Sequence, residues 1–240
     1  MEDVFESIPS NKFISFSSGS HVRLVDSLPR MVPIGRGCDF AIVRNARVST
    51  GNGLKTIEQD KALINRLYKD NHTSPFESVS FVFEIKCQLF TATHLIRHRT
   101  AKINMFSQRY ASVDKVDKSV EKLWYTPDAR RQSKSNHQGS EDSKESNEHL
   151  DELILKADEH IKELFSLYNE MLNYGMAREV ARYCLPESTF TSLYFEIDLN
   201  NLLKFFKLRC APDTQQETRE ISCAMRDLIR PLLPMMAEFL

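Results

Sequence analysis

The sequence predicts an α+β fold, a single mixed α/β domain with a central antiparallel-type sheet flanked by helices. Apolar and polar residues alternate over 79–87, which is the period of a strand with one buried face. Helical periodicity precedes and follows this strand, but without the regular alternation of a doubly wound sheet. The 240 residues, 41% of them apolar, are enough for one packed core, so we expect one domain over 1–240.

The elements before that strand are predicted from local composition. Residues 1–37 mix Ser, Gly and Pro with short apolar runs, and we expect a loosely structured segment with one strand around 22–25. Residues 39–48 are apolar enough to enter the core as a helix or a strand, and the small residues of 49–53 predict a turn. Apolar side chains recur at helical spacing over 56–68, which predicts a helix.

After the strand over 79–87, helical spacing returns over 89–99. On such a helix His94 and Arg97 are three residues apart and share a face. The residues of 126–148 are almost free of large apolar groups, so they bury too little surface to offset their ordering entropy. We expect a flexible polar insertion there.

The C-terminal third is predicted to be helical around one further strand. Helical spacing over 150–172 indicates a long amphipathic helix, and alternation over 193–197 indicates the strand. Asp198 follows that strand and is suited to cap the next helix. Thr214 and Glu217 have the spacing of a capping box, which predicts the start of the last helix.

Composition excludes several classes of protein. A formal net charge of −1 argues against broad binding to nucleic acid through an overall basic surface. The five Cys residues are scattered and odd in number, so neither a disulfide framework nor a Cys-rich zinc site is expected. No apolar run reaches the roughly 20 residues that span a bilayer. We expect a soluble, cytoplasmic protein with reduced thiols and no metal.

The most biased stretch is 97–110, where Arg97, Arg99 and Arg109 accompany His98 with almost no countercharge. Asn, Ser and Gln side chains in the same stretch add hydrogen-bonding groups. The planar fork of Arg stays charged and matches two phosphate oxygens at once. This stretch therefore predicts a site for an anion.

Other interpretations of this stretch remain open. His94 and His98 have the i, i+4 spacing of a zinc site, although the neighbouring arginines would repel a dication. Ser107 lacks the Gly-x-Ser-x-Gly elbow of a nucleophile, and no Gly-rich dinucleotide or P-loop motif occurs. The arginines can also form plain surface ion pairs. A hypothesis of another class is a single-stranded nucleic-acid-binding module that stacks bases on Phe106 and Tyr110.

Arg97-His98-Arg99, followed after seven residues by Ser107, resembles the arginine-histidine-arginine-x7-serine signature of the flavin-dependent thymidylate synthases. Further segments between about residues 40 and 230 resemble that family in the right order. They are Ala46-Arg47-Val48-Ser49, His72-Thr73-Ser74-Pro75-Phe76-Glu77, Ala181-Arg182-Tyr183-Cys184-Leu185-Pro186, Phe205-Phe206-Lys207-Leu208-Arg209, and Gln215 with Glu217.

The resemblance implies a thymidylate synthase-complementing-like fold and a methyltransferase that converts dUMP to dTMP. It implies methylenetetrahydrofolate as the carbon donor, FAD as the redox carrier and NADPH as the reductant. A flavin that carries the hydride leaves the protein to bind, orient and supply charge. The family also implies a homotetramer whose active sites are shared between subunits. The alternative within this chemistry is a paralogue that methylates another uracil nucleotide such as UMP.

The resemblance assigns residues by position. It implies dUMP contacts at His94, Arg97, Met105, Ser107, Gln108, Arg109, Arg182 and Arg209. It implies FAD contacts at Ser49, Ser74, Glu77, Arg97, His98, Arg99, Thr100, Met105, Asp198, Asn200 and Lys204. Three of the implied residues are catalytic: Arg209, Ser107 and His72. Arg209 would lie against the uracil ring and favour ionisation of its ring nitrogen. His72 would lie near the flavin, where the folate or nicotinamide stacks.

The chain departs from the family pattern at five of the relevant positions. Lys102 stands where the family often has Ser, and Met105 where it usually has an acidic or amide residue. The family's Asn-x-Arg is Asp198-Leu199-Asn200 here, and Lys204 replaces an Asn or His. We expect the changed charge to weaken FAD binding unless Lys204 or Lys102 compensates.

Plainer roles compete with the implied ones. Arg182 and Arg209 can be ion-pair partners of Glu179 or Glu217. His72 can cap the preceding helix, and Ser49 and Ser74 can be turn residues.

Overall fold

We analysed a computed structural model of the chain. It describes residues 5–8, 12–118, 122–137, 139–141 and 147–240. Parts of two predicted segments lie outside the described residues, namely 1–4 and 9–11 of the N-terminal segment and 138 and 142–146 of the polar insertion.

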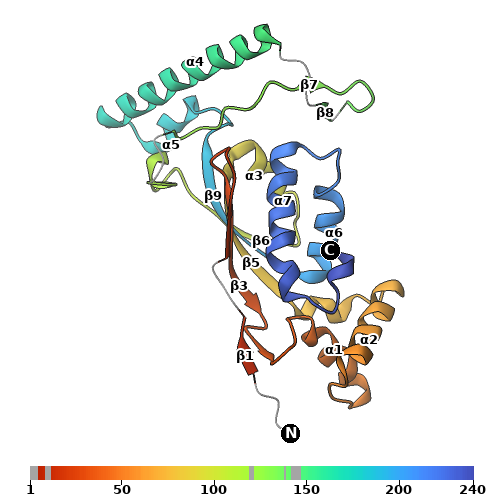
Figure 1. The fold of residues 1–240 in the computed structure, drawn as a ribbon. Coiled ribbons are helices and arrows are strands. Elements are labelled where there is room, and N and C mark those ends of the chain that lie inside the picture. The colour runs from red at the N-terminus through yellow and green to blue at the C-terminus, as the bar shows by residue number, and fades with distance from the viewer. Residues whose placement is uncertain (1–4, 9–11, 119–121, 138, 142–146) are drawn as a thin grey trace.

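A five-stranded antiparallel sheet with the order β2-β3-β5-β9-β6 forms the centre of the structure (Figure 1). Its strands are β2 (Lys12–Ser15), β3 (His21–Leu28), β5 (Ser80–Gln88), β6 (Lys102–Met105) and β9 (Phe190–Asp198). Two short pairs stand apart from it, β1 (Phe5–Ser7) with β4 (Met31–Pro33) and β7 (Arg131–Gln132) with β8 (Ser140–Glu141). The predicted α+β fold with a central antiparallel sheet is confirmed.

Seven α-helices surround the sheet in the described part of the chain. They are α1 (Phe40–Arg47), α2 (Ile57–Lys69), α3 (Leu89–Leu95), α4 (Glu148–Asn173), α5 (Arg178–Ala181), α6 (Leu199–Arg209) and α7 (Gln216–Ile229). The 3-10 helices are η1 (Val48–Thr50), η2 (Ser74–Ser78), η3 (Val113–Lys115), η4 (Arg182–Cys184), η5 (Arg230–Leu232) and η6 (Ala237–Phe239).

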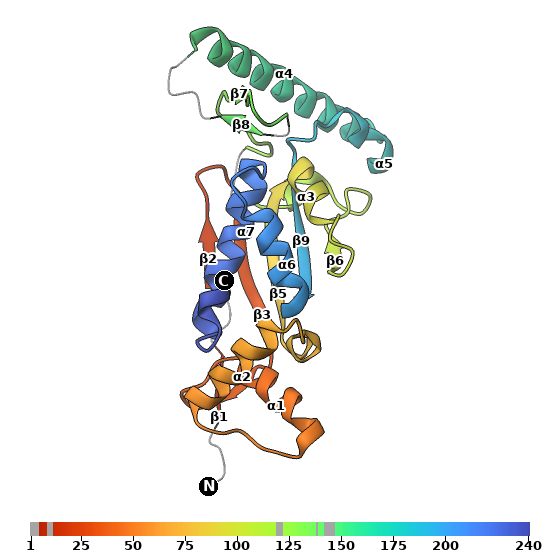
Figure 2. The same cartoon turned by 90° about the vertical axis from the view of Figure 1, so that its right-hand side faces the viewer.

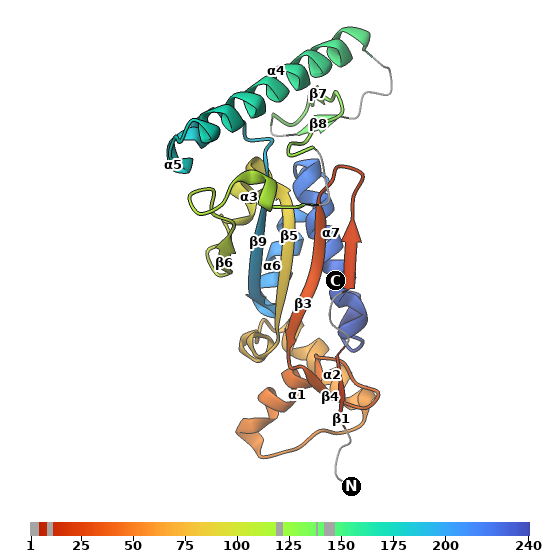
Figure 3. The same ribbon diagram turned by 90° about the vertical axis from the view of Figure 1, so that its left-hand side faces the viewer.

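The helices cover the sheet unequally. α6 and α7 pack on one face (Figure 2), whereas Figure 3 shows the other face of β3, β5 and β9 turned toward the viewer with both helices behind it. Phe81, Phe83 and Ile85 of β5 are fully buried in the main core, whereas Val82 and Glu84 between them are partly exposed. The alternation predicted over 79–87 is confirmed from 80 to 85, because the covered face takes the large apolar side chains. It is wrong at Lys86, which is buried and paired with Asp117 at 2.6 Å.

A smaller core lies under α4, at the opposite end of the molecule from α1 and α2 (Figures 1 and 3). Phe165 and Tyr168 of α4 are buried there, and Trp124 stacks on Phe165 with ring centroids 5.0 Å apart. The N-terminal half of α4 is less covered, and Leu155 is 66% exposed. Within the described residues, no helix has the length and apolarity needed to cross a bilayer.

Several predicted elements are confirmed by their caps. α2 covers the helix predicted over 56–68, and the Thr56 side chain accepts the main-chain N–H of Gln59. Asp198 caps α6 by accepting the N–H of Asn201 at 3.0 Å. α4 extends over the predicted 150–172.

Two predictions are wrong because tertiary contacts override local patterns. The N-terminal segment forms β1, β2, β3 and β4 rather than one strand, since short strands of mixed polarity such as β2 show no clear alternation. α7 does not start with a capping box. Its N-cap is Gln215, while the Thr214 hydroxyl donates to the carbonyl of Leu208 and Glu217 is buried.

Candidate active site

The Arg-rich stretch begins in the turn between α3 and β6 and continues through β6 to Tyr110. The helix predicted over 89–99 ends at Leu95, because no apolar residue extends its buried face and Ile96 is 43% exposed. Arg97 therefore lies outside the helix that carries His94, which corrects the predicted shared helical face. Arg97 and Arg99 are exposed, and the described part of the chain supplies neither with an ion pair. Both guanidinium groups are thus open to solvent.

The second half of the site is placed by α6, whose last residue is Arg209. Its Nε donates to Nε2 of His98 at 2.9 Å, and the His98 ring lies edge-on against Phe205. Burial and the nearby Arg209 guanidinium lower the pKa of His98. His98 is therefore a neutral imidazole that accepts at Nε2, and it orients the cation beside it.

His94, on α3, lies in the same electrostatic environment. Its Nδ1 is 3.1 Å from the Thr218 hydroxyl on α7. Burial and Arg209 lower the pKa of His94, while Glu217 opposes them. Arg209 thus acts on two histidines from two different segments. Among the described residues, no group of three or more His, Cys, Asp or Glu side chains is arranged to hold a metal ion.

His94 and Arg209 line a cavity of about 770 Å³, which we call the His94–Arg209 cavity. Residues 127–130 and 139–140 and the N-terminal half of α4 form its other wall, with apolar side chains from α4 and polar ones from 127–140. A cavity of this volume is large enough for a nucleotide-sized ligand. Sequence analysis assigned no function to 127–140, so this wall was missed.

Arg130, from that wall, is held by a buried acid on α7. It donates to Glu217 and, at 2.7 Å, to Oε1 of Gln216, and the Tyr125 hydroxyl donates to Glu217 at 3.2 Å. Glu217 is 4% exposed, and such a carboxylate requires a cation. Glu217 lies in a segment that resembles the family, and this match suggested that it has a partner. Nothing in the sequence identifies Arg130 as that partner. Within the described residues no ion pair joins Glu217 to Arg209, and the Oε2 atom of Glu217 has no hydrogen-bond partner there.

Ser107, Gln108, Arg109 and Arg182 form a second group of predicted residues near η4. Arg109 donates from Nε to Glu179 at 3.1 Å, so the partner considered for Arg182 is taken by Arg109. Arg182 is exposed. Gln108 is buried, and its Nε2 has no hydrogen-bond partner within the described ranges. Gln108 directly precedes Arg109, and an orphaned amide donor next to a guanidinium is suited to an oxygen-rich ligand.

The residues assigned to the flavin divide between the two ends of α6, with Asp198, Asn200 and Glu77 at its N-terminus and His98 beside Arg209 at its C-terminus. The Asn200 amide donates to Glu77 at 3.1 Å, which joins α6 to η2. Ser49, His72 and Ser74 are exposed on η1, before η2 and on η2. The spacing along α6 from Asn200 to Arg209 corresponds to about 14 Å, so a flavin-sized molecule can extend along it.

The substituted positions have definite contacts. Both oxygens of the Asp198 carboxylate bind Asn201, at 3.0 Å to its N–H and 2.6 Å to its side-chain amide. Its charge is therefore directed at the N-terminus of α6, where the helix dipole stabilises it. Lys102 is paired with Glu196 at 2.6 Å, whereas Lys204 is exposed. Of the two lysines considered as compensating cations, Lys204 is the one without a recorded ion pair in the described chain.

The predicted site residues therefore form three groups. His98 contacts Arg209, Glu77 contacts Asn200, and Arg109 contacts Glu179. Within the residues that the structure describes, no recorded hydrogen bond or ion pair joins one group to another. The Met105 side chain, assigned to both ligands, is 40% exposed on the edge strand β6.

Comparison with known proteins gives consistent matches. Residues 34–235 match the family model described as thymidylate synthase complementing protein. The flavin-dependent thymidylate synthase of Dictyostelium discoideum is 39% identical over 246 residues, covering 96% of this chain and 78% of that protein. The enzyme of the same name from Thermus thermophilus is 40% identical over 215 residues, covering 89% and 73%.

Solved structures agree. The UMP/dUMP methylase PolB from Streptomyces cacaoi bound with 5-Br UMP superposes with a TM-score of 0.76 at 31% identity, covering 92% of this chain and 93% of that one. The same protein bound with 5-Br dUMP gives a TM-score of 0.77 at 30% identity, covering 92% and 94%.

Proposed function

Because this chain belongs to the thymidylate synthase complementing protein family, we propose that it is a flavin-dependent thymidylate synthase that methylates dUMP to dTMP. The family predicted from the Arg97-His98-Arg99 signature is confirmed. The observation that carries the proposal is the Arg209–His98 pair at the edge of a nucleotide-sized cavity.

In this proposal Arg209 stabilises a negative charge on the uracil. A fixed cation next to the ring favours loss of the proton from the ring nitrogen, which raises the electron density of the ring. Neutral His98 holds the guanidinium by accepting from its Nε, so the remaining N–H groups stay available to the base. His94 lines the same cavity and adds a neutral hydrogen-bonding group.

The phosphate of dUMP is assigned to the second group. Arg109 and Arg182 offer guanidinium forks, and Ser107 and the orphaned Gln108 amide offer neutral hydrogen bonds. Arg97 would contribute from the signature turn.

The residues present fit a flavin. FAD would supply the hydride chemistry. The exposed guanidiniums of Arg97 and Arg99, which form no ion pair with the described residues, suit its diphosphate, and Asn200 is already held by Glu77. Ser49, Ser74, Thr100 and Lys204 offer exposed polar groups, and His72 would lie near the ring with the incoming co-substrate.

The separation of the predicted residues supports a site assembled from several subunits. The Arg209–His98 group and the Arg109–Arg182 group have no recorded contact within the described chain, and one face of β3, β5 and β9 is turned away from α6 and α7 (Figure 3). Tyr194 is 45% exposed on β9. A homotetramer of single-domain subunits that pairs the Arg209 group of one subunit with the Arg182 group of another accounts for both features. A cytoplasmic location, NADPH and methylenetetrahydrofolate belong to the same proposal.

A second candidate is methylation of UMP. The solved structures with TM-scores of 0.76 and 0.77 belong to a protein described as a UMP/dUMP methylase, with each brominated nucleotide bound. A hydroxyl at the ribose 2′ position is the only difference that the site would have to tolerate.

The test is the visible spectrum of the purified chain, followed by an assay with dUMP, methylenetetrahydrofolate and NADPH. We expect the absorption of an oxidised flavin and formation of dTMP. A flavin spectrum with turnover of UMP alone would select the second candidate. No flavin after reconstitution with FAD would contradict both.

A further inference from the structure

A second cavity, of about 580 Å³, lies at the α1–α2 end of the molecule. Its walls are the end of α1, the loop 50–55 and one face of α2, and we call it the α2 cavity. Arg47, Lys55 and Arg66 line it, and no Asp or Glu does. No residue assigned above to dUMP or the flavin lines this cavity.

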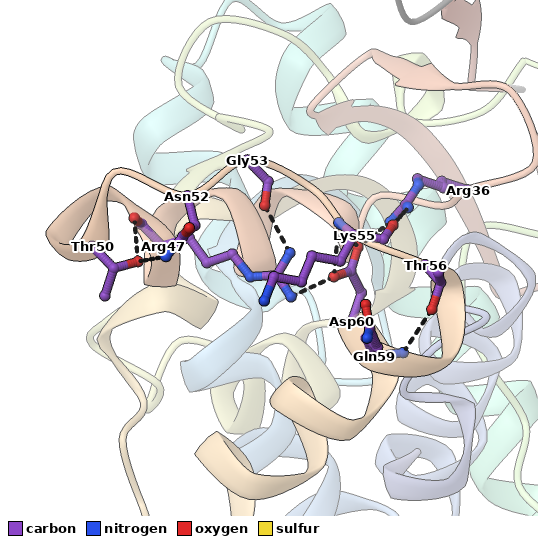
Figure 4. A network of polar contacts seen from close by, with 9 residues as sticks. All are labelled: Arg36, Arg47, Thr50, Asn52, Gly53, Lys55, Thr56, Gln59 and Asp60. Carbon is purple, nitrogen blue, oxygen red and sulfur yellow. Dashed lines mark hydrogen bonds and ion pairs between the residues drawn. The ribbon is translucent and has the colours of Figure 1, made fainter.

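A buried carboxylate organises one wall of the α2 cavity (Figure 4). Asp60 on α2 is fully buried, and it receives Nη1 of Arg36 at 2.5 Å and Nη2 of Arg47 at 2.6 Å. The main-chain N–H of Lys55 lies 3.3 Å from both of its oxygens. Asp60 therefore holds the loop against α2.

The charges in this cluster do not cancel. The side chains of Arg36, Arg47 and Asp60 are 12%, 9% and 0% exposed, so two nearly buried guanidiniums face one carboxylate. Both arginines also donate to main-chain carbonyls, Arg36 to Lys55 and Arg47 to Gly53. Those bonds satisfy N–H groups but carry no net charge. The cluster therefore keeps one net positive charge where little water screens it. An anion bound there is stabilised more strongly than one at the exposed surface.

Two further cations add positive charge along the wall of the α2 cavity. Lys55 and Arg66 are exposed, and the described chain records no ion pair for either side chain. Thr50 and Asn52, hydrogen-bonded to each other at 3.0 Å, line the cavity as neutral polar groups. Guanidinium and ammonium groups together with hydroxyl and amide groups are the usual partners of phosphate and carboxylate oxygens.

We propose that the α2 cavity binds the oxyanion end, phosphate or carboxylate, of a co-substrate. The proposal rests on the proposed function, which requires two anionic co-substrates besides the nucleotide: a dinucleotide with phosphates and a folate with carboxylates. Thr50 in the cavity wall directly follows Ser49, which is assigned to the flavin, and consecutive Cα atoms are about 3.8 Å apart. The cavity therefore adjoins a position assigned to the flavin, as the proposal requires of a co-substrate anchored by its anionic end.

The direct test uses inorganic pyrophosphate as the probe, with the full chain measured by calorimetry. Lys55→Gln/Arg66→Gln removes two cavity cations. Lys61→Gln/Lys69→Gln removes two charges from exposed positions of the same helix that do not line the cavity. We expect the cavity variant to lose one class of pyrophosphate site or to weaken it at least tenfold, and the control to retain it. Equal isotherms for the two variants would overturn the proposal.

The KM values of the FAD-loaded Lys55→Gln/Arg66→Gln variant then identify which co-substrate carries the oxyanion. A tenfold rise in the KM for NADPH but not for NADH assigns the cavity to the 2′-phosphate. A rise in the KM for both assigns it to the diphosphate that they share. A rise with a triglutamate folate but not its monoglutamate assigns it to the carboxylates. Unchanged KM values in all arms, or a loss of FAD affinity in their place, would overturn the co-substrate assignment.

Failure of the two proposals is distinguishable. Pyrophosphate binding needs no turnover, so it tests the cavity even in a chain that forms no dTMP. Conversely, dTMP formation with equal pyrophosphate isotherms would retain the enzyme and reject the cavity.

Discussion

Arg36 and Arg47 at the α1–α2 end are held by the buried Asp60, whereas Arg97 and Arg99 after α3 are exposed without a recorded ion pair in the described chain. The four side chains have the same chemistry. They differ because α2 carries a carboxylate into the core, whereas among the described residues no acid forms an ion pair with the signature turn. A buried countercharge thus fixes the position of an arginine, whereas an exposed arginine without an ion pair in the described chain can reorient toward a ligand.

The largest expected effect is at Asp60. Asp60→Asn leaves two nearly buried guanidiniums without their countercharge, so we expect the free energy of unfolding to fall by about 3–5 kcal/mol. Urea denaturation measures it. Glu179→Gln is the matched control, because it removes the exposed partner of Arg109 and should cost less than about 1 kcal/mol. Similar losses in both variants would remove the distinction between the two sets of arginines.

A buried acid without an arginine partner sharpens the comparison. Asp39 accepts the N–H of Met235 at 2.6 Å, and burial raises its pKa to about 7. Between about pH 4 and 7 the folded state therefore binds more protons than the unfolded state, and stability falls as pH rises. The expected loss is on the order of 4 kcal/mol across that range. Asp39→Asn should lack it, and parallel pH profiles of stability in the two proteins would refute this assignment.

At the proposed uracil site the effect should be on rate. Arg209→Gln removes the cation that stabilises the uracil anion, and we expect kcat to fall roughly 10²- to 10³-fold. The flavin spectrum and the denaturation midpoint should change little, because Arg209 is only partly buried. A rise in KM with kcat unchanged would assign Arg209 to binding alone.

The proposed phosphate group should affect affinity. Arg182→Gln removes charge-assisted hydrogen bonds worth about 1.5–3 kcal/mol, so the KM for dUMP should rise roughly ten- to hundredfold. Because Arg182 is exposed, unfolding should be unaffected. An Arg182 variant with a normal KM would leave Arg109 and Arg97 as the phosphate ligands.

The smallest expected effect is a change in the pKa of His98. Arg209 is one cause of the lowered pKa of His98, so Arg209→Gln should raise that pKa toward the ordinary value of histidine. NMR titration of the ring protons measures this change. An unchanged value would mean that burial alone accounts for the lowered pKa.

The sequence by itself determined features that depend on neighbours along the chain. The alternation of β5 and the caps of α2 and α6 were predictable, because periodicity and capping are set by residues within a few positions. The signature stretch identified the family for a related reason, since its Arg, His and Ser are close in sequence.

Tertiary structure alone decided which charges are neutralised. Glu217 binds Arg130 across 87 positions, Arg109 binds Glu179 across 70, and Asp60 binds Arg36 across 24. The capping box failed for this reason, because a buried carboxylate gains more from a cation than from a helix N-terminus. The wall formed by 127–130, 132 and 139–140 was likewise hidden, since a polar segment shows no periodicity and its place is set by the helices on which it packs.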